Sequence, residues 1–232
     1  MQIMITGHSR GLGAALARHH LQLGDTVYAM ARGTLEHESR RLHQRHADFS
    51  EPQTLPSILQ RLLPDTLAVD RVYLNAGVLG PIAAMSDTDL AELRDVMDVN
   101  VWANKEILDT LNARNPAVKQ IILISSGAAI RGNFGWGAYA LSKAALNMLA
   151  QLYAHEMPDC QLVALAPGLV DTDMQAQLRN QSAREFPSLK RLHEAAGSAA
   201  MPSADIAAAR IVSCLAQLTD HPSGQFLDLR DL

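Results

Sequence analysis

The chain has little of what marks secreted or membrane proteins. Its 232 residues contain two cysteines, Cys160 and Cys214, so we expect no disulfide framework, and we expect a cytoplasmic, reducing location. The first residues predict a buried strand and not a signal peptide. Apolar runs are interrupted within about ten positions, whereas a membrane-spanning helix needs roughly 18 consecutive apolar residues. We therefore expect no membrane insertion.

Aromatic side chains and an excess of charge of one sign are also scarce. Aromatic residues make up 4% of the chain, the formal net charge is −4, and the basic residues are scattered. This composition lacks the basic surface that nucleic-acid binding requires, so a small-molecule ligand is expected. The histidines, His19 and His20 among them, lack a second group of Cys, Asp or Glu at ligand spacing, and we predict no metal site.

The length of the chain favours one domain. A chain of 232 residues that is 48% apolar can bury a substantial core, but it leaves little room for two domains of about 100–200 residues each. No repeat, low-complexity tract or Gly/Ser linker divides the sequence. We expect a single domain over residues 1–232.

Short apolar segments alternate with longer segments of helical periodicity, the order that a parallel sheet with crossover helices requires. The predicted strands are Gln2–Thr6, Thr26–Ala31, His46–Phe49, Arg71–Asn75, Gln120–Ser125, Gln161–Ala166 and Gln225–Leu229. The predicted helices are Leu12–Leu23, Leu35–Arg45, Pro52–Leu63, Asp87–Asn112, Ala138–His155 and Ser203–Leu218. Together they predict an α/β fold, a doubly wound seven-stranded parallel sheet whose ligand crevice lies at the carboxyl ends of the strands.

A glycine-rich turn follows the first strand. Gly7, Gly11 and Gly13 have the spacing Gly-x-x-x-Gly-x-Gly and lead into a helix. Small residues there let a pyrophosphate approach the free backbone N–H groups at the positive end of the helix dipole. By itself the pattern also suits an ordinary tight turn. We expect His8, inside the turn, to be exposed near the phosphates, with direct phosphate contact as the alternative.

Tyr139 and Lys143 are four positions apart in an apolar helical segment, so their side chains share one face of the helix. A nearby ammonium favours the phenolate and lowers the pKa of a tyrosine from its usual value of about 10, which would make Tyr139 a usable acid–base group. Without other evidence, such a pair also fits an ordinary helix surface.

These motifs occur together and in order. Each of them follows a predicted strand or begins the next helix: Thr6-Gly7-x-x-x-Gly11-x-Gly13, Asn75-Ala76-Gly77, Ser126, Tyr139-x-x-x-Lys143 and Pro167-Gly168. The combination resembles the single-domain members of the short-chain dehydrogenase/reductase family, over nearly the whole chain. The resemblance implies a Rossmann fold and an oxidoreductase that transfers a hydride between a nicotinamide and a carbonyl or alcohol carbon.

The resemblance also implies a catalytic set of Asn100, Ser126, Tyr139 and Lys143. Tyr139 would be the general acid in reduction and the base in oxidation, and Lys143 would lower its pKa and hold the nicotinamide ribose. Ser126 would donate a hydrogen bond to the substrate carbonyl, with its neighbour Ser125 as the alternative. Asn100 would bond through water to the lysine, or bond to a distorted turn of its own helix, and the two roles are compatible.

The cofactor-binding residues that the resemblance implies lie after several strands. They are Gly7, Ser9, Arg10, Gly11, Leu12, Gly13, Arg32, Asp48, Phe49, Asn75, Ala76, Gly77, Tyr139, Lys143, Pro167, Gly168, Val170 and Thr172. Asp48 would accept a hydrogen bond from the adenine amino group, with a helix cap as the alternative. Asn75 would mainly brace the central sheet, and Val170 and Thr172 would face the nicotinamide carboxamide.

The charge after the second strand predicts NADP(H) in preference to NAD(H). An NAD-selective site places a carboxylate there, whereas an arginine accommodates the 2′-phosphate of NADP. Arg32 follows the strand, no acidic residue lies between Val27 and Gly33, and Arg10 lies in the glycine turn. The guanidinium group suits phosphate geometry.

The substrate and the quaternary structure are less defined by sequence. We expect residues 169–202 to form a lid of apolar to mixed character, which favours a medium-sized hydrophobic carbonyl compound, or a diketone or pterin-like carbonyl because the short ending resembles benzil and sepiapterin reductases. Extra apolar circumference on Ala138–His155 predicts a homodimer or homotetramer.

A second functional class stays open at this point. The protein could be a catalytically silent NADP(H)-binding sensor or scaffold with the same fold. Because Ser126, Tyr139 and Lys143 are all present, we favour the enzyme.

Overall fold

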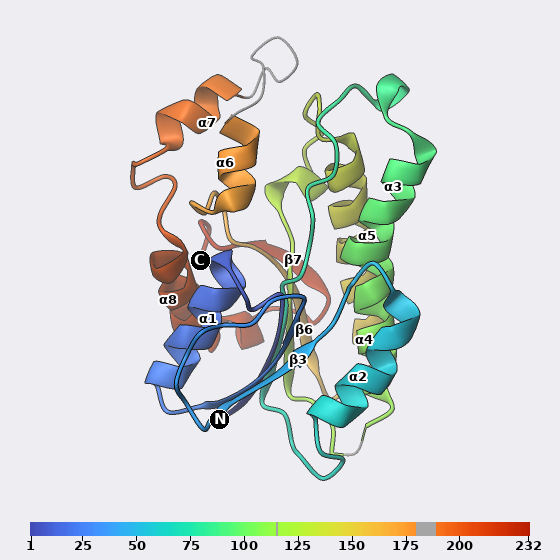
Figure 1. Cartoon of the computed structure of the whole chain (residues 1–232), viewed down its shortest axis with the longest axis vertical. Coiled ribbons are helices and arrows are strands. Elements are labelled where there is room, and N and C mark those ends of the chain that lie inside the picture. The colour runs from blue at the N-terminus through green and yellow to red at the C-terminus, as the bar shows by residue number, and fades with distance from the viewer. Residues whose placement is uncertain (115, 180–188) are drawn as a thin grey trace.

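The structure, a computed structural model, describes residues 1–114, 116–179 and 189–232 (Figure 1). Its centre is one sheet of seven parallel strands in the order β3-β2-β1-β4-β5-β6-β7. The strands are β1 (Gln2–Thr6), β2 (Thr26–Ala31), β3 (Leu42–His46), β4 (Arg71–Leu74), β5 (Gln120–Ile124), β6 (Gln161–Ala166) and β7 (Gln225–Asp228). The predicted doubly wound sheet is therefore confirmed.

Helices connect the strands on both faces of the sheet. The α-helices are α1 (Gly11–Gln22), α2 (Leu55–Leu62), α3 (Leu90–Met97), α4 (Ala103–Asn112), α5 (Gly137–Glu156), α6 (Asp173–Arg179), α7 (Leu189–Ala195) and α8 (Ala204–Cys214). Short 3-10 turns are η1 (Pro52–Thr54), η2 (Met85–Asp87), η4 (Gly127–Ala129) and η5 (Gln217–Asp220), and η3 (Asp98–Trp102) is a π-helical turn.

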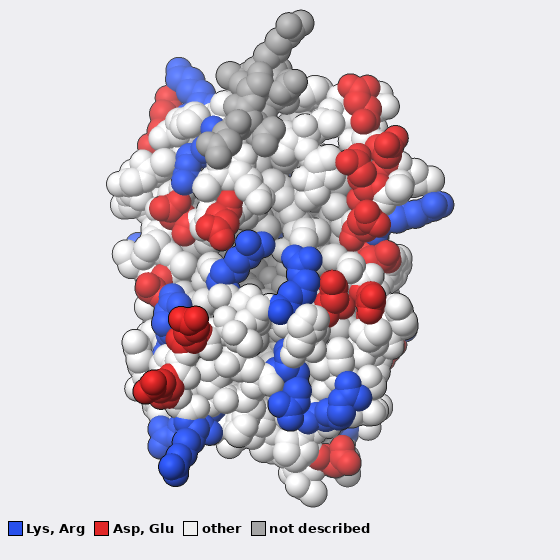
Figure 2. All heavy atoms as spheres, viewed as in Figure 1, with Lys and Arg blue, Asp and Glu red and all other residues white. Residues whose placement is uncertain are grey.

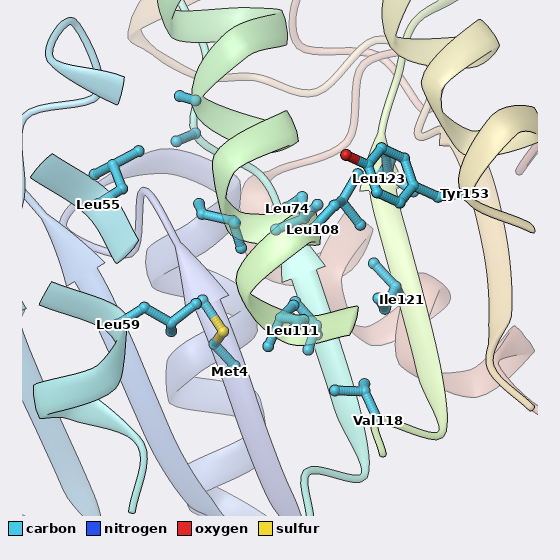
Figure 3. Packing of buried hydrophobic residues seen from close by; sticks show 14 of the residues in the cluster. Met4, Leu55, Leu59, Leu74, Leu108, Leu111, Val118, Ile121, Leu123 and Tyr153 are labelled. Atoms are coloured by element: carbon cyan, nitrogen blue, oxygen red, sulfur yellow. The ribbon is translucent and has the colours of Figure 1, made fainter. Parts of the chain in front are cut away.

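The apolar residues form a layer on each face of the sheet. On one face, α1 and α8 pack together against the strands (Figure 1). On the other face, α2, α4 and α5 cover a second layer. Figure 3 shows Leu59 of α2 and Leu111 of α4 beside Met4 of β1 in that layer. Every residue of β5 is buried, as expected for a central strand covered by helices on both sides.

The order of the strands reverses at β1. This strand pairs with β2 on one side and with β4 on the other, so the chain leaves it in opposite directions. In a doubly wound sheet the connections then separate at the carboxyl ends of the strands and leave a crevice there. The glycine turn follows β1 and therefore lies in this crevice.

The prediction of a helix at Leu35–Arg45 is wrong. β3 occupies the end of that segment, Leu42–His46, where it pairs in parallel with β2. The predicted strand at His46–Phe49 begins only where β3 ends. β3 is an edge strand whose residues are exposed or half-buried, so it lacks the apolar run that marks the inner strands. Its pairing with β2 decides its conformation.

The long helix predicted at Asp87–Asn112 is interrupted. α3 begins with a capping box, in which Asp89 and Glu92 satisfy each other's backbone N–H groups. The π-helical turn η3 then separates α3 from α4. The side chain of Asn104 donates to the carbonyl of Asn100 at 2.8 Å and satisfies a group that the distorted turn leaves open.

The remaining predicted helices differ mainly in length. The segments Pro52–Leu63 and Ser203–Leu218 each contain a shorter α-helix, α2 or α8, next to a 3-10 turn. The segment predicted as a lid, residues 169–202, carries α6 and α7, which lie together beyond the carboxyl edge of the sheet (Figure 1). Its residues 180–188 lie outside the described residues. In the part of the chain that is described, no helix is long and apolar enough to cross a membrane.

Candidate active site

The glycine turn is built so that two of its positions accept only glycine. A Cβ on Gly13 would lie 2.2 Å from the carbonyl oxygen of Gly7, which no side chain tolerates. Gly7 has a φ of +70°, and its Cβ would lie 2.9 Å from the Cα of Ala76. The start of α1 is thereby held tightly against β1 and against the turn that follows β4.

Thr6 and Asn75 fix this junction with hydrogen bonds. The hydroxyl of Thr6 accepts from the backbone N–H groups of Asn75 at 2.9 Å and Ala76 at 3.0 Å. The Asn75 amide donates to the carbonyls of Thr6 at 3.0 Å and Gly7 at 3.2 Å. Asn75 therefore braces the two central strands, as predicted.

A cavity of about 620 Å³ opens beside this junction. Its lining includes the predicted residues Gly7, Ser9, Arg10, Gly11, Leu12, Arg32, Asp48, Phe49, Asn75, Ala76, Gly77 and Thr172. The amino end of α1 has no side-chain cap and no acidic residue in its first turn, so its dipole favours an anion in the cavity. Figure 2 shows a hollow near the middle of this face with basic side chains on its rim.

The charged lining residues have different surroundings. Arg10 lies 3.6 Å from Asp173 in an exposed ion pair, so this arginine is loosely held. Asp48 accepts from the backbone and the hydroxyl of Ser50 at 3.0 and 2.8 Å, and these hydrogen bonds lower the pKa of its carboxyl group. Asp48 thus stabilises a local turn and lines the cavity, and it is not the cap of the next helical turn, which begins after Glu51.

Tyr139 is buried at the start of α5 and has Ser126 and Trp136 beside it. Burial raises the pKa of Tyr139, and a hydrogen bond with the Ser126 hydroxyl opposes this rise. The Trp136 ring lies edge-on to the Tyr139 ring, with 6.1 Å between centroids. The expectation that the pKa of Tyr139 is lowered is wrong for this structure, because the loss of hydration outweighs the favourable contacts.

Lys143 lies one turn further along α5 and is only 4% exposed. Its Nζ donates to the carbonyl of Ile124, at the end of β5, at 2.7 Å and lies 5.7 Å from the centre of the Tyr139 ring. Burial lowers the pKa of Lys143 to about 8. Among the described residues Ile124 is its one hydrogen-bond acceptor, although an ammonium has three donors.

Asn100 connects helix α5 to the cavity. Its amide pairs with the backbone of Val78, accepting from the N–H at 2.8 Å and donating to the carbonyl at 2.9 Å, and it also donates to Ser142 at 2.9 Å. A Cβ on Gly77 would lie 3.1 Å from Asn100 Oδ1 and 3.5 Å from Lys143 Nζ. Gly77 lines the cavity, so the cavity meets Asn100 and Lys143 at this glycine.

The structure does not bring every predicted residue to the cavity. Gly13 is packed beneath the turn, and Pro167, Gly168 and Val170 are not part of the lining, although they follow β6 at the same edge of the sheet. The four predicted catalytic residues also lie outside the lining: Asn100, Ser126, Tyr139 and Lys143. The choice between the two serines is clearer. Ser125 is buried and hydrogen bonded to Asn147 at 2.5 Å, whereas Ser126 contacts Tyr139.

Sequence reasoning missed several cavity-lining residues, among them Val78, Leu79 and Asp173, and three residues that pack around the predicted site. Ser142 joins the Asn100 amide to the carbonyl of Tyr139, Trp136 packs on Tyr139, and the stem of Arg230 would be 3.4 Å from a Cβ on Gly168. Ser142 had a signal, because it is a polar residue three positions after Tyr139 in an apolar helix. Arg230 had none, because it is distant in sequence.

The histidines have structural surroundings of their own. The expectation that His8 is exposed is wrong: it is fully buried, with Nε2 2.6 Å from the side-chain oxygen of Gln44. His20 is hydrogen bonded on both ring nitrogens, and His43 stacks on Tyr28. In the described ranges no three His, Cys, Asp or Glu side chains form a group that could hold a metal ion.

The profile of the family described as short chain dehydrogenase matches residues 1–183. The chain belongs to the short-chain dehydrogenase family. It is therefore an oxidoreductase of a fold that binds a nicotinamide cofactor.

Several known proteins are similar to this member of the family. An uncharacterized oxidoreductase of Schizosaccharomyces pombe is 35% identical over 192 residues, which cover 79% of this chain and 76% of the relative. A benzil reductase ((S)-benzoin forming) of Bacillus subtilis is 28% identical over 239 residues, 98% of each chain. The crystal structure of the KRED1-Pglu enzyme superposes with a TM-score of 0.88 at 27% identity and covers 98% of this chain and 100% of that chain.

Proposed function

We propose that this short-chain dehydrogenase is an NADP(H)-dependent carbonyl reductase or alcohol dehydrogenase. The observation that carries the proposal is that a cavity lined by Arg10 and Arg32 meets Asn100 and Lys143 at Gly77, and that Lys143 lies beside Tyr139 and its neighbour Ser126. A silent binding protein would not need a buried lysine and tyrosine beside its nucleotide cavity. Burying such groups costs stability, and groups of this kind are typical of functional sites.

The donor groups of the cavity fit a dinucleotide. The uncapped amino end of α1 and the positive-φ turns at Gly7 and Gly11 present backbone N–H groups to an anion, and Arg10 and Arg32 add positive charge. When bound, the nicotinamide supplies or accepts the hydride. The residues of the chain then have to bind it, exclude water and move one proton.

Tyr139 is the group that moves the proton. A tyrosine has an ordinary pKa of about 10, and burial raises the pKa of Tyr139 further, so its phenol holds the proton that it donates to the alkoxide oxygen developing during reduction. Ser126, hydrogen bonded to the same phenol, is placed to donate to that oxygen as well and to stabilise its charge. In the oxidation direction Tyr139 accepts the proton instead.

Lys143 supports Tyr139 and the cofactor. The Ile124 carbonyl, the helix α5 and burial hold the ammonium in place, and its remaining N–H donors are available to ribose hydroxyls. A ligand that adds acceptors around the ammonium favours its charged form, and the charged form in turn favours the Tyr139 phenolate. Lys143 therefore couples cofactor binding to the acidity of Tyr139.

The preference for NADP(H) over NAD(H) rests on Arg32 and Arg10. Both line the cavity, and no acidic side chain follows β2 where a carboxylate would bind the ribose 2′-hydroxyl. Replacing Arg32 with Asp should lower the affinity for NADPH at least about tenfold relative to the affinity for NADH, because the 2′-phosphate then meets a carboxylate. Fluorescence titration of the reduced cofactors measures both affinities. A wild-type protein that prefers NADH would refute the assignment.

A medium-sized hydrophobic carbonyl compound, including a diketone, is the proposed substrate class. Tyr139 and Trp136 belong to an apolar cluster to which Leu79 and residues of α6 and α7 also contribute. Apolar walls bind an apolar body, while Ser126 and Tyr139 orient the carbonyl oxygen. The likeness to a benzil reductase points in the same direction.

We also propose a homodimer or homotetramer with a cytoplasmic location. Helix α5 exposes Leu141, Met148 and Leu152, each at least half exposed, on a surface that a second copy of the chain would cover. The free cysteines Cys160 and Cys214 agree with a reducing compartment. Light scattering that gave a monomer mass at micromolar concentration would exclude the oligomer.

The decisive test of the function is turnover with NADPH. The protein should reduce members of a panel of ketones, aldehydes, diketones and quinones, measured as loss of NADPH absorbance. A protein that binds NADPH and turns over none of them would be a sensor or scaffold, and the proposal of an enzyme would then fail.

A further inference from the structure

His8 lies inside the glycine turn yet does not line the cavity. It is fully buried, and its Nε2 lies 2.6 Å from the side-chain oxygen of Gln44, on the edge strand β3. Gln44 is also bound to the backbone of Leu35: the Leu35 N–H donates to Gln44 Oε1 at 2.8 Å, and Gln44 Nε2 donates to the Leu35 carbonyl at 3.2 Å. One side chain thus joins the glycine turn to the segment between β2 and β3.

The two bonds to Leu35 fix which way the Gln44 amide points. Its oxygen must face the Leu35 N–H, so the group that meets His8 is an acceptor, and His8 Nε2 must carry the hydrogen. The other ring nitrogen, Nδ1, is buried and has no hydrogen-bond partner among the described residues. The neutral ring with its hydrogen on Nε2 satisfies this geometry.

A second contact lies beside the first. Gly33 follows Arg32 directly, and a Cβ on Gly33 would lie 3.2 Å from Cβ and 3.3 Å from Oγ of Ser9, the next residue of the glycine turn. His8 is therefore joined to Leu35 through Gln44, and Ser9 lies against Gly33. Arg32 is held next to these two points of attachment and lines the cavity.

The segment that carries Arg32 has no helix or strand of its own between Ala31 and Leu42. Such a segment loses conformational entropy when it must hold a side chain in one place for a ligand. Contacts that fix the segment before the ligand arrives remove part of that cost. The guanidinium of Arg32 then meets the 2′-phosphate without rearrangement of the backbone.

We propose that His8 and Gln44 form a positioning linkage that presents Arg32 to the 2′-phosphate of NADP(H) and so contributes to the choice of NADP(H) over NAD(H). The inference rests on the proposed cofactor preference and assigns it a structural cause outside the cavity lining. His8 and Gln44 act through the position of Arg32 and touch no reacting atom.

The linkage is tested by removing its hydrogen bond while the shape is kept. In the variant His8→Phe, the affinity for NADPH should fall about tenfold and that for NADH by less than about threefold, measured by fluorescence titration. Adenosine 2′,5′-bisphosphate and 5′-AMP, which lack the nicotinamide, should show the same contrast by calorimetry. The variant His8→Gln, whose amide can donate to Gln44, should recover most of the loss.

Two further variants keep the test independent of one substitution. Gly33→Ala places a methyl group against Ser9 at a backbone conformation that alanine accepts, and it should shift the ratio of the two affinities in the same direction. His20→Phe is the matched control, because His20 is equally buried but its hydrogen bonds go to Asp25 and Tyr73 and not to the segment that carries Arg32. It should lower thermal stability and leave the ratio unchanged.

The outcomes separate the linkage from the cofactor assignment. If the wild type prefers NADPH but His8→Phe and Gly33→Ala keep the wild-type ratio, or weaken both dinucleotides equally, the linkage is refuted and the cofactor assignment stands. If the wild type prefers NADH, the assignment fails and the linkage fails with it.

Discussion

Two buried tyrosines, Tyr73 in the sheet and Tyr139 at its carboxyl edge, differ in the polar groups that surround them. Tyr73 lies on β4 and its hydroxyl is 2.9 Å from His20, whose other ring nitrogen is 2.8 Å from Asp25. Tyr139 lies on α5 beyond the carboxyl ends of the strands, with Ser126 and Lys143. Burial raises the pKa of both tyrosines. The perturbed pKa therefore does not distinguish the catalytic candidate from the structural residue.

What differs is whether the hydrogen bonds of each cluster are complete. Both ring nitrogens of His20 have partners, so the Tyr73 cluster has little left to offer a ligand. In the Tyr139 cluster, Lys143 uses one of its three donors within the described residues and sits next to a cavity. A buried polar group with unused hydrogen-bonding capacity beside a cavity is the better sign of function.

The largest effect that separates the two tyrosines is expected when the Tyr139 hydroxyl is removed. Tyr139→Phe should lower kcat by about 10³-fold or more, because phenylalanine keeps the packing and cannot donate a proton. Steady-state rates with NADPH and a good carbonyl substrate measure the loss, and cofactor titration should show nearly unchanged affinity. Retention of more than a small fraction of the wild-type rate would show that the proton comes from another group.

The two adjacent serines give the next largest contrast. Ser126→Ala should lower kcat by about 10²-fold, because a hydrogen bond to the developing alkoxide is lost. Ser125→Ala should leave kcat within about threefold and instead cost about 1–2 kcal/mol of stability, because the buried Asn147 side chain loses its partner. Kinetics and urea unfolding on both variants decide the assignment, and the reverse pattern would exchange the two roles.

Lys143 should make the stability of the ligand-free protein depend on pH. Its pKa is about 8 when folded, against 10.5 as the reference value for the unfolded chain, so between these values unfolding takes up a proton. Stability therefore rises with pH across this window, by about 2 kcal/mol from pH 8 to pH 9.5. Below pH 8 the buried charge continues to cost its full amount.

The measurement is urea unfolding of the wild type and of Lys143→Met at several pH values. The variant lacks this titration, so the difference in unfolding free energy between the two proteins should change with pH by the amount given above. A difference that stays constant from pH 8 to pH 9.5 would mean that burial does not lower the pKa of Lys143. At neutral pH the variant should also bind NADPH weakly, because it lacks the ammonium.

The smallest effect is expected at the structural tyrosine. Tyr73→Phe should cost about 1–2 kcal/mol of unfolding free energy, because the buried His20 Nε2 loses its partner, while kcat changes little. Thermal unfolding and turnover of this variant complete the comparison with Tyr139→Phe. A large loss of kcat would show that the two clusters are coupled.

The sequence by itself determined the parts of this protein that depend on local chemistry. The apolar runs located six of the strands nearly to the residue, five of them inner strands, which are buried on both faces in a parallel sheet, and the sixth the edge strand β7. The glycine turn was recognisable because Gly7 and Gly13 lie where no side chain fits. The four-residue spacing of Tyr139 and Lys143 placed both on one face of α5.

Only the tertiary structure decided the features that depend on partners far away in the chain. The edge strand β3 forms because β2 pairs with it, and the break between α3 and α4 appears where Asn104 satisfies the carbonyl of Asn100. His8 is buried because Gln44 meets it across 36 positions. The pKa of Tyr139 is raised because folding removes water from it, a cost that a nearby lysine in the sequence does not reveal.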